Sequence, residues 1–181
     1  SLKTAKPQTA FKAGTVGWRV ENLNFEQCYF GVVASGRHVD LKVRRCIFNM
    51  LLWNESKTRV GSIAVSVRPL PPLYRGLPYK VEVDENETHG PTGANVDAAL
   101  SGIVVTADSA RVTRNGIDGY RIGIVCEGLG LVVGRNTITG GTIGIVAWNT
   151  GVLGTQTTGG YVVNNEIKVS RGIEYPDGSV E

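Results

Sequence analysis

The feature that most constrains the fold is a repeat. Between Val112 and Thr150 the sequence nearly repeats itself after 21 residues. The motif begins with an aliphatic residue; Asn follows three positions later, Ile five positions later, and Gly-Ile eleven and twelve positions later. Self-similarity at a period of about 20 to 50 residues is typical of proteins whose structural units stack on one another. The fold must therefore be considered as a stack of units.

Weaker copies of the motif extend the repeat in both directions; the one that begins at Val162 has its Gly-Ile, Gly172-Ile173, one residue early. In two of them the second half comes late, and we assign it to Ser62-Ile63 and to Gly102-Ile103. We interpret the irregular spacings as insertions at turns, where stacked repeats tolerate them. The chain then contains six units, which begin at Val20, Val43, Val83, Val112, Val133 and Val162.

Within each unit the residue pattern is that of short β-strands. Runs such as KVEV, AVSV and GIV are rich in Val and Ile and are separated by Gly, Asn and Thr. Units of this length without a crossover helix can pair in parallel only by winding as a coil, each turn about 4.8 Å above the last. Parallel crossovers are right-handed in the great majority of proteins. We predict an all-β, right-handed parallel β-helix (solenoid) of about six rungs with inserted turn loops.

The repeated residues have an architectural interpretation. The six anchor valines form one inward column, and we expect a second column at Phe25, Phe48, Thr88, Ile117, Ile138 and Ile167. The repeated Asn is expected to bond to the Asn of the next rung, and the repeated Gly to give the second corner its backbone freedom. Cys46 takes the place of Asn in the second unit. The predicted asparagine ladder comprises Asn86, Asn115, Asn136 and Asn165.

The pattern N-x-I followed by G-I at this period resembles the right-handed parallel β-helix superfamily of pectin lyase-like proteins. That superfamily includes pectate lyases, polygalacturonases, alginate epimerases and bacteriophage tailspikes. The resemblance extends over residues 17–175. It implies the fold, a polysaccharide partner and an extracellular, cell-surface or virion location. It does not select an activity, because members include lyases, hydrolases, epimerases and non-catalytic modules.

We expect one β-helix domain at residues 17–181, preceded by an N-terminal segment, residues 1–16, that caps the first rung. The sequence shows no amphipathic helix that would cover the last rung, and an uncovered solenoid end exposes strand edges. Further domains of a longer protein, or a homo-oligomer, are therefore expected at the uncapped ends. The chain begins without Met or a signal-like segment, which favours a processed or excised protein.

Composition excludes several classes of function. A scattered net charge of +3 argues against nucleic acid as a partner, and no run of 18 apolar residues marks a membrane span. Three cysteines without a CxxC spacing are expected to be free, buried thiols. No cofactor and no metal is indicated; calcium is compatible with such a fold, but no pattern points to it.

Candidate catalytic residues follow the second strand of each unit. His89 and Asp118 occupy equivalent positions in neighbouring units, so we expect them one strand spacing apart, with Arg121 nearby and Lys168 further along. A lyase needs a base to remove the C5 proton of a uronic acid and a cation to stabilise the enolate, whereas a hydrolase needs two carboxylates. His89 or Asp118 would be the base, and Arg121 or Lys168 the cation. The alternative is a solvated turn.

Candidate substrate-binding residues lie in two insertions, at 68–79 and 149–160, which we expect to leave the coil at the same corner. The first carries Tyr74, Arg75 and Tyr79, and Trp148 enters the second. Aromatic rings bind the apolar faces of sugars, and Arg binds hydroxyls or carboxylates. A Pro-rich clasp packed on the coil is the alternative for the first insertion. Elsewhere on the surface we expect an ion pair between Arg45 and Glu85.

Three functions remain open at this point. The first is a carbohydrate-directed domain, a polysaccharide lyase, glycoside hydrolase or epimerase acting on an acidic glycan. The second is a non-catalytic structural or adhesion module, such as a segment of a phage tail fibre or a surface protein stalk. The third, a metal-handling β-helix, has little support because the chain has two His and one Met.

Overall fold

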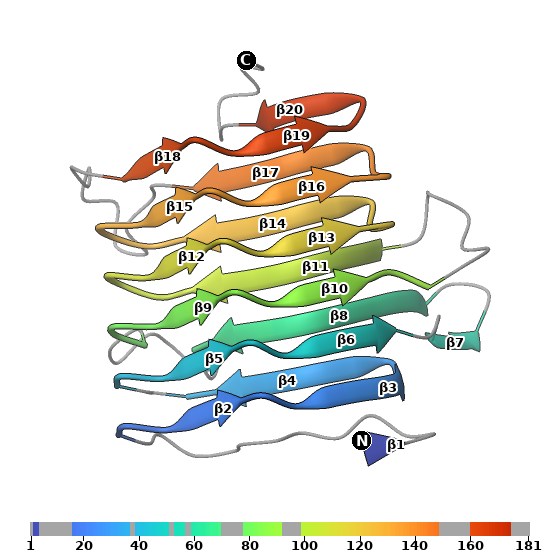
Figure 1. Cartoon of the computed structure of the whole chain (residues 1–181), viewed down its shortest axis with the longest axis horizontal. Coiled ribbons are helices and arrows are strands. Elements are labelled where there is room, and N and C mark those ends of the chain that lie inside the picture. Colours follow the sequence, from blue (N-terminus) through green and yellow to red (C-terminus); the bar gives the residue numbers. More distant parts are fainter. Residues whose placement is uncertain are drawn as a thin grey trace.

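The structure is a computed structural model, which describes residues 2–3, 16–36, 39–50, 53–56, 59–69, 78–91, 99–148 and 160–174. In this part of the chain every regular element is a β-strand. The strands wind into a coil of six rungs, and equivalent strands of successive rungs form three parallel sheets (Figure 1). The predicted fold class is therefore confirmed.

Each rung passes through the three sheets in the same order. Sheet I contains the first strand of each rung, which ends at a sharp bend. Its members are β2 (Arg19–Glu21), β5 (Lys42–Arg44), β9 (Glu82–Asp84), β12 (Arg111–Thr113), β15 (Val132–Gly134) and β18 (Tyr161–Val163).

Sheet II follows the bend, and its strands are also short. Besides one strand from each rung it includes β1, which pairs in parallel with β3 at the N-terminal end. Its members are β1 (Leu2–Lys3), β3 (Asn24–Cys28), β6 (Ile47–Met50), β10 (Glu87–His89), β13 (Gly116–Asp118), β16 (Thr137–Thr139) and β19 (Glu166–Lys168).

Sheet III completes each rung with the longest strands. β7 (Trp53–Ser56) forms an antiparallel hairpin with one of them, β8. The members of sheet III are β4 (Phe30–Ser35), β8 (Arg59–Arg68), β11 (Ala99–Thr106), β14 (Ile122–Glu127), β17 (Ile143–Trp148) and β20 (Arg171–Glu174).

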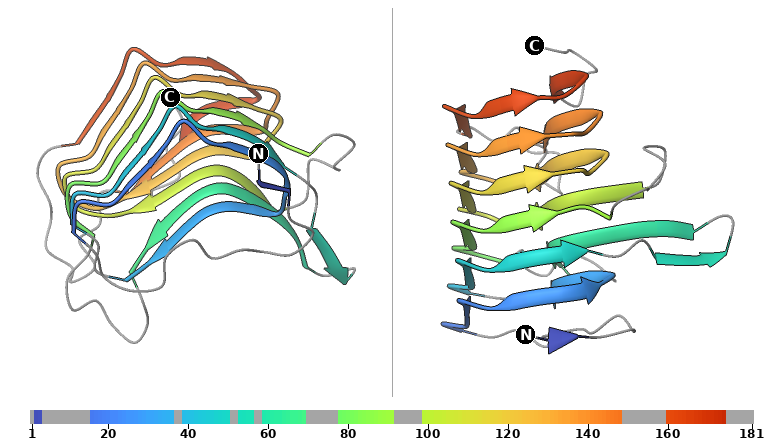
Figure 2. Two further views of the ribbon diagram at one scale, coloured as in Figure 1. Left: turned by 60° about the horizontal axis from the view of Figure 1, so that its bottom comes forward. Right: turned by 45° about the vertical axis from the view of Figure 1, so that its right-hand side comes forward.

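The coil is right-handed. In Figure 1 the chain crosses the near side from left to right along sheets I and II, returns behind along sheet III, and rises towards the C-terminus. Figure 2 shows the cross-section, in which sheets I and II meet at an angle. The insertions at 68–79 and 149–160 both join a strand of sheet III to the next strand of sheet I. They leave the coil at the same corner, as predicted.

The two predicted inward columns are present in the core. The six anchor valines are paired in register along sheet I, and Val133 is only 1% exposed. In sheet II the column from Phe25 to Ile167 is likewise in register. Phe25 and Phe48 stack with ring centroids 4.7 Å apart. These apolar columns supply the buried surface that holds the rungs together.

The expected second half of the second unit is wrong by two residues. Val65, not Ile63, pairs with Val32 below and Ile103 above, so Ala64-Val65 is the equivalent of the Gly-Ile pair in other rungs. A shift of two residues keeps the same strand face inward. The alternation of the sequence therefore did not distinguish the two registers.

The asparagine ladder runs through the bend between sheets I and II. The Asn86 amide donates to the side-chain oxygen of Asn115 at 2.9 Å, Asn115 to Asn136 at 3.0 Å, and Asn136 to Asn165 at 2.9 Å. Each of these amides also donates to the carbonyl of the anchor valine one rung below, as Asn86 does to Val43. The bonds predicted between successive rungs are present.

Cys46 continues the ladder in the second rung with different chemistry. Its backbone N–H donates to the side-chain oxygen of Asn86, and its thiol contacts the carbonyl of Val20 at 3.5 Å. The thiol thus occupies the place that an amide nitrogen takes in the later rungs.

The residue before each ladder position has a left-handed backbone. Its φ lies between 50° and 58° in all six rungs, a conformation that L-residues seldom adopt. This residue turns the chain from sheet I into sheet II, so its side chain lies on the outside of the bend. The six residues are Asn22, Arg45, Glu85, Arg114, Arg135 and Asn164.

The repeated glycines have a different role from the predicted one. None of Gly31, Gly102, Gly123 and Gly144 has a left-handed φ. A Cβ on Gly123 would lie 2.6 Å from Ile138 and 2.7 Å from the carbonyl oxygen of Gly144. These glycines are required because successive rungs leave no room for a side chain, and the expectation of corner flexibility was wrong.

Candidate functional site

The predicted catalytic residues His89 and Asp118 lie on the outer face of sheet II. They end β10 and β13 and are paired in register, so their Cα atoms are about one strand spacing apart, roughly 5 Å. Both side chains are exposed. The same column continues through Thr139 to Lys168 on the next two rungs. The predicted alignment of these positions is therefore present.

Asp118 is oriented by its neighbour in the next rung. The Thr139 hydroxyl donates to Oδ1 of Asp118 at 2.6 Å, which leaves the other carboxylate oxygen free among the described residues. His89 and Arg121 make no ion pair or side-chain hydrogen bond with any described residue, and both are exposed. His89, in register with the oriented carboxylate, and the exposed Arg121 are therefore available to a ligand.

Lys168 does not join this group. Its Nζ forms an ion pair with Glu166 at 2.6 Å, in the same strand, and hydrogen bonding to that carboxylate raises the pKa of Lys168. Two strand spacings, about 10 Å, separate its backbone from that of Asp118. Lys168 is thus committed to a local pair at the far end of the column.

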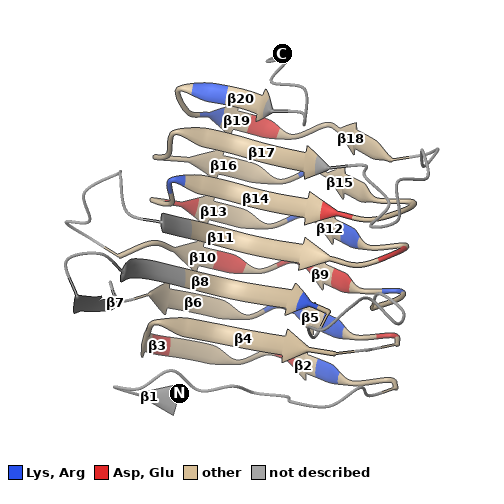
Figure 3. Cartoon of the chain, turned by 180° about the vertical axis from the view of Figure 1, so that it is seen from behind, with Lys and Arg blue, Asp and Glu red and all other residues tan. Residues whose placement is uncertain are grey.

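The outer face of sheet II carries an excess of negative charge. One positively charged side chain, Lys168, stands against four carboxylates in the strands from β3 to β19 (Figure 3). Such a surface repels an acidic glycan unless the cation at Arg121 compensates. The four carboxylates are those of Glu26, Glu87, Asp118 and Glu166.

The predicted binding residues lie elsewhere. Tyr79 is 44% exposed at the corner before β9, where it pairs with Val39 and Asp108, and Nζ of Lys80 lies 5.5 Å from the centre of its ring. Tyr74 and Arg75 lie outside the described residues, as does the side chain of Trp148 at the end of β17. In Figure 1, β9 begins at the left edge of the coil and β10 ends at the right edge. The structure therefore does not bring Tyr79 together with His89.

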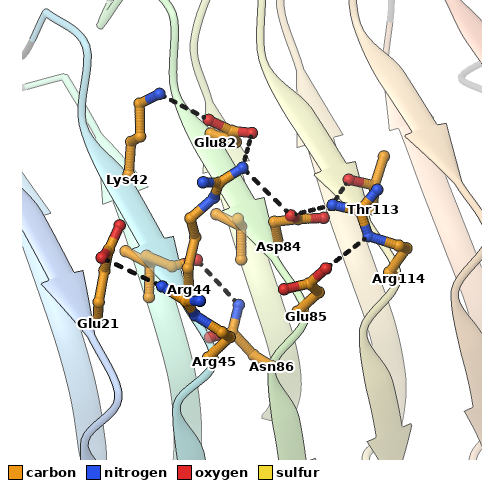
Figure 4. Close-up of polar contacts among 12 residues, drawn as sticks. Glu21, Lys42, Arg44, Arg45, Glu82, Asp84, Glu85, Asn86, Thr113 and Arg114 are labelled. Atoms are coloured by element: carbon orange, nitrogen blue, oxygen red, sulfur yellow. Dashed lines mark hydrogen bonds and ion pairs between the residues drawn. The ribbon is translucent and has the colours of Figure 1, made fainter.

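A charged cluster on the outer face of sheet I was not predicted. At its centre Asp84 is fully buried, although it points outwards, because Arg44 and Arg114 cover it (Figure 4). Oδ2 of Asp84 contacts both guanidinium groups, and Oδ1 accepts a 2.6 Å hydrogen bond from Thr113. The sequence could have indicated this cluster. At equivalent positions of successive units, the acidic pair at 84–85 lies between the two arginines at 44–45 and Arg114.

The surrounding ion pairs differ from the expected one. Arg45 turns down to Glu21 at 3.4 Å, and Glu85 pairs with Nε of Arg114 at 3.2 Å, so the predicted pair between Arg45 and Glu85 is wrong. Glu82 is shared by Lys42 at 3.2 Å and Arg44 at 2.7 Å. A long basic side chain can reach the rung above or the rung below. The sequence alone therefore does not identify the carboxylate with which each of these cations pairs.

An open depression of about 410 Å³ lies beside this cluster, along the bend between sheets I and II. Arg45, Glu85 and Arg114 line it on the side of the bend, and Ile47 and Glu87 line it on the side of sheet II. Its charged groups at the bend are already paired with one another or with Glu21 and Asp84. We therefore regard the depression as part of the structural charge cluster.

Glu127, at the end of β14, is a candidate acid that the sequence did not identify. Partial burial raises its pKa, and a hydrogen bond with Thr106 opposes that shift. It pairs in register with Trp148 on the next strand of sheet III. A carboxyl group with a raised pKa is a candidate general acid.

The described residues include no group of three or more His, Cys, Asp and Glu arranged to hold a metal ion. Nor do they contain a helix long and apolar enough to cross a membrane. The chemistry available on the described surface is that of carboxylates, guanidinium and ammonium groups, one imidazole and exposed aromatic rings. No protein-family model, curated protein or solved structure matches this chain.

Proposed function

We propose that this chain is a carbohydrate-directed β-helix domain of the pectin lyase-like type, acting on an acidic polysaccharide outside the cell or on a virion. The observation that carries the proposal is the placement of His89 and Asp118 side by side on successive rungs, both exposed and neither in an ion pair with a described residue. A glycan chain lying along the coil axis would meet both groups in succession.

The proposed chemistry is proton abstraction from a uronic acid. His89 takes the C5 proton, and the guanidinium of Arg121 stabilises the negative charge that develops on the sugar carboxylate. The C4–O bond then breaks as the double bond between C4 and C5 forms. Asp118, held by Thr139, positions the sugar or protonates the leaving oxygen. In a hydrolase, Asp118 and Glu87 would instead be the two carboxylates.

The test is a screen of the purified chain against acidic and neutral polysaccharides, with detection of unsaturated uronate by absorbance and of reducing ends. His89→Ala and Asp118→Asn should each lower turnover by about two orders of magnitude or more at an unchanged melting temperature. The matched control is Glu166→Gln, on the same face but three rungs from His89. Turnover that survives in both variants but is lost in Glu127→Gln would place the reaction on sheet III instead.

A non-catalytic structural or adhesion module is the second candidate. The observation that favours it is the four carboxylates on the outer face of sheet II, which repel an acidic substrate. If the chain neither cleaves nor binds any glycan of the panel, and the variants behave like the wild type, this second function replaces the first.

A further inference from the structure

The outer face of sheet I is divided into two halves that differ in charge pairing. On rungs 1 to 3 every described cation except Arg19 is paired with a carboxylate, whereas on rungs 4 to 6 two arginines remain unpaired on the same face as an exposed tyrosine. We infer that Arg111, Arg135 and Tyr161 form a binding surface for the acidic groups and sugar rings of an anionic glycan. This inference rests on the proposed function, but it concerns a surface separate from His89 and Asp118.

In the lower half of this face the carboxylates hold every described cation except Arg19, which stands alone at the N-terminal end. Lys42 and Arg44 bind Glu82, Arg45 binds Glu21, and Arg44 also contacts Asp84 (Figure 4). A glycan carboxylate would have to displace one of these groups, each of which lies within 4.0 Å of its cation. Such displacement exchanges one ion pair for another and gives little net affinity.

Arg111 and Arg135 are in a different position. Both are exposed, and neither makes an ion pair or side-chain hydrogen bond with any described residue. Arg111 pairs in register with Glu82, but both carboxylate oxygens of Glu82 are directed to Lys42 and Arg44. Arg135 stands on the bend with Arg114 below, which Asp84 and Glu85 already hold. These two guanidinium groups therefore have no anionic partner of their own.

The rest of this half of the face carries no acidic residue. Besides Arg135, rungs 5 and 6 contribute only neutral side chains. Arg111 and Arg135 belong to two parallel columns of this face, and the column between them contains the small, buried residues Thr113 and Gly134. In this column only the apolar Val163 of rung 6 is exposed. The neutral residues of rungs 5 and 6 on this face are Val132, Gly134, Tyr161, Val163 and Asn164.

Tyr161 adds an aromatic platform. Its side chain is 65% exposed and makes no hydrogen bond with a described residue. It lies in the same column as Arg111, two rungs further along, which places the two backbones about 10 Å apart. A tyrosine ring covers the apolar face of a sugar while its hydroxyl stays hydrated. Arginine nearby binds carboxylate or sulfate with two parallel hydrogen bonds.

An acidic glycan fits this surface better than a nucleic acid does. The unpaired cations number two, and the patch offers a single exposed aromatic ring over three rungs. Nucleic-acid surfaces depend on a longer track of cations and, for single strands, on several stacking rings. Carboxylated and sulfated sugars present the same chemistry to Arg, and direct binding measurements distinguish them.

The experiment measures binding of the full chain to polygalacturonate fragments and to heparin fragments at low salt. The double variant Arg111→Gln/Arg135→Gln should bind at least about tenfold more weakly, and its affinity should depend less on salt. Tyr161→Ala should weaken binding several-fold with little change in that dependence. Arg19→Gln is the matched control, because it lies in the same column as Arg111, exposed and without a described partner, on rung 1.

Three results would overturn the inference. One is wild-type affinity in the double variant, and another is an equal loss in Arg19→Gln, which would indicate only the net charge of the chain. The third is equal affinity for an oligothymidylate of matched charge, which would show that the surface does not select sugars. Turnover in Asp118→Asn is measured separately. If only the proposed catalysis fails, the loss of binding in Arg111→Gln/Arg135→Gln remains, and if only the glycan surface fails, the loss of turnover in Asp118→Asn remains.

Discussion

Asn115 and Asn136 are joined by two hydrogen bonds to one atom. The side-chain oxygen of Asn136 accepts both the backbone N–H and the side-chain amide of Asn115, each at 3.0 Å. The same arrangement links Asn86 to Asn115 and Asn136 to Asn165. The side-chain oxygen of each of these ladder residues thus accepts from both the backbone N–H and the side-chain amide of the asparagine one rung below. These donors lie at a bend, where no strand partner is available.

Asn136→Leu should destabilise the coil by on the order of 3 kcal/mol. The substitution leaves two buried donors of Asn115 and the carbonyl of Val112 without partners, and each unsatisfied group costs about 1 to 3 kcal/mol before the structure relaxes. Chemical denaturation measures the effect. Asn165→Leu is the comparison, because Asn165 is only half-buried and should cost less. Equal stability of Asn136→Leu and wild type would contradict a structural role for the ladder.

The ladder and the inward columns were predictable because one residue type recurs at one interval. Val112 and Val133, or Asn115 and Asn136, identify each other without knowledge of the fold. The role of Gly123 was not predictable in the same way. A recurring glycine indicates either a left-handed backbone or a lack of space, and only the distance to Ile138 in the next rung decides between them.

Gly123→Ala should cost about 1 to 3 kcal/mol through overpacking. The new Cβ would meet Ile138 of the next rung at 2.6 Å. The second rung shows how the coil accommodates alanine: Ala64 stands at the glycine position, and the next residue of the inward column of sheet II is Thr88 instead of Ile. Gly123→Ala combined with Ile138→Thr should therefore be less unstable than the sum of the two single variants. A double-mutant cycle by urea unfolding measures the coupling, and strict additivity would exclude this contact as the cause.

Asp84→Asn should destabilise the protein by about 2 to 3 kcal/mol. The buried carboxylate compensates Arg44 and Arg114, and its loss leaves two cations facing each other across the face of sheet I. The exposure of Arg114 moderates the loss, since water screens that guanidinium. Glu85→Gln is the control, because Glu85 pairs with the same arginine but is exposed, and it should change stability by about 1 kcal/mol or less. A larger effect at Glu85 than at Asp84 would disprove this ranking.

The pairing within this cluster was beyond sequence reasoning for a physical reason. Register fixes the Cα positions of Arg45 and Glu85, but an arginine side chain is long enough to reach the rung above or below. Arg45 reaches down to Glu21, and Glu85 is paired with Arg114 above it. Likewise, the burial of Asp84 arises from the two side chains that cover it rather than from the strand face on which it lies. Which carboxylate an arginine binds, and which side chain becomes buried, therefore depends on the residues of several rungs at once.

The three thiols should be unreactive in the folded protein, and stability should fall at alkaline pH. Cys28, Cys46 and Cys126 are free and buried, and burial raises the pKa of Cys46 and raises that of Cys126 to about 12. The unfolded chain loses the thiol protons of Cys46 and Cys126 above about pH 9, whereas the folded chain keeps them to a higher pH. The unfolded state then binds fewer protons, so the free energy of unfolding declines by about 1 kcal/mol per pH unit for Cys126 between pH 9 and about pH 12.

Cys126→Val tests this linkage without disturbing the core, because Val105 and Ala147 occupy the same position in the neighbouring rungs. Denaturant titrations from pH 8 to 11 should show a shallower alkaline decline in the variant than in the wild type. Part of the decline should remain, since burial also raises the pKa of Tyr120. Ellman's reagent should detect no thiol in the native wild-type protein at pH 8 and three after unfolding in guanidinium. Rapid labelling of the native protein would contradict the burial of the three thiols. An alkaline decline that Cys126→Val leaves unchanged would contradict the raised pKa of Cys126.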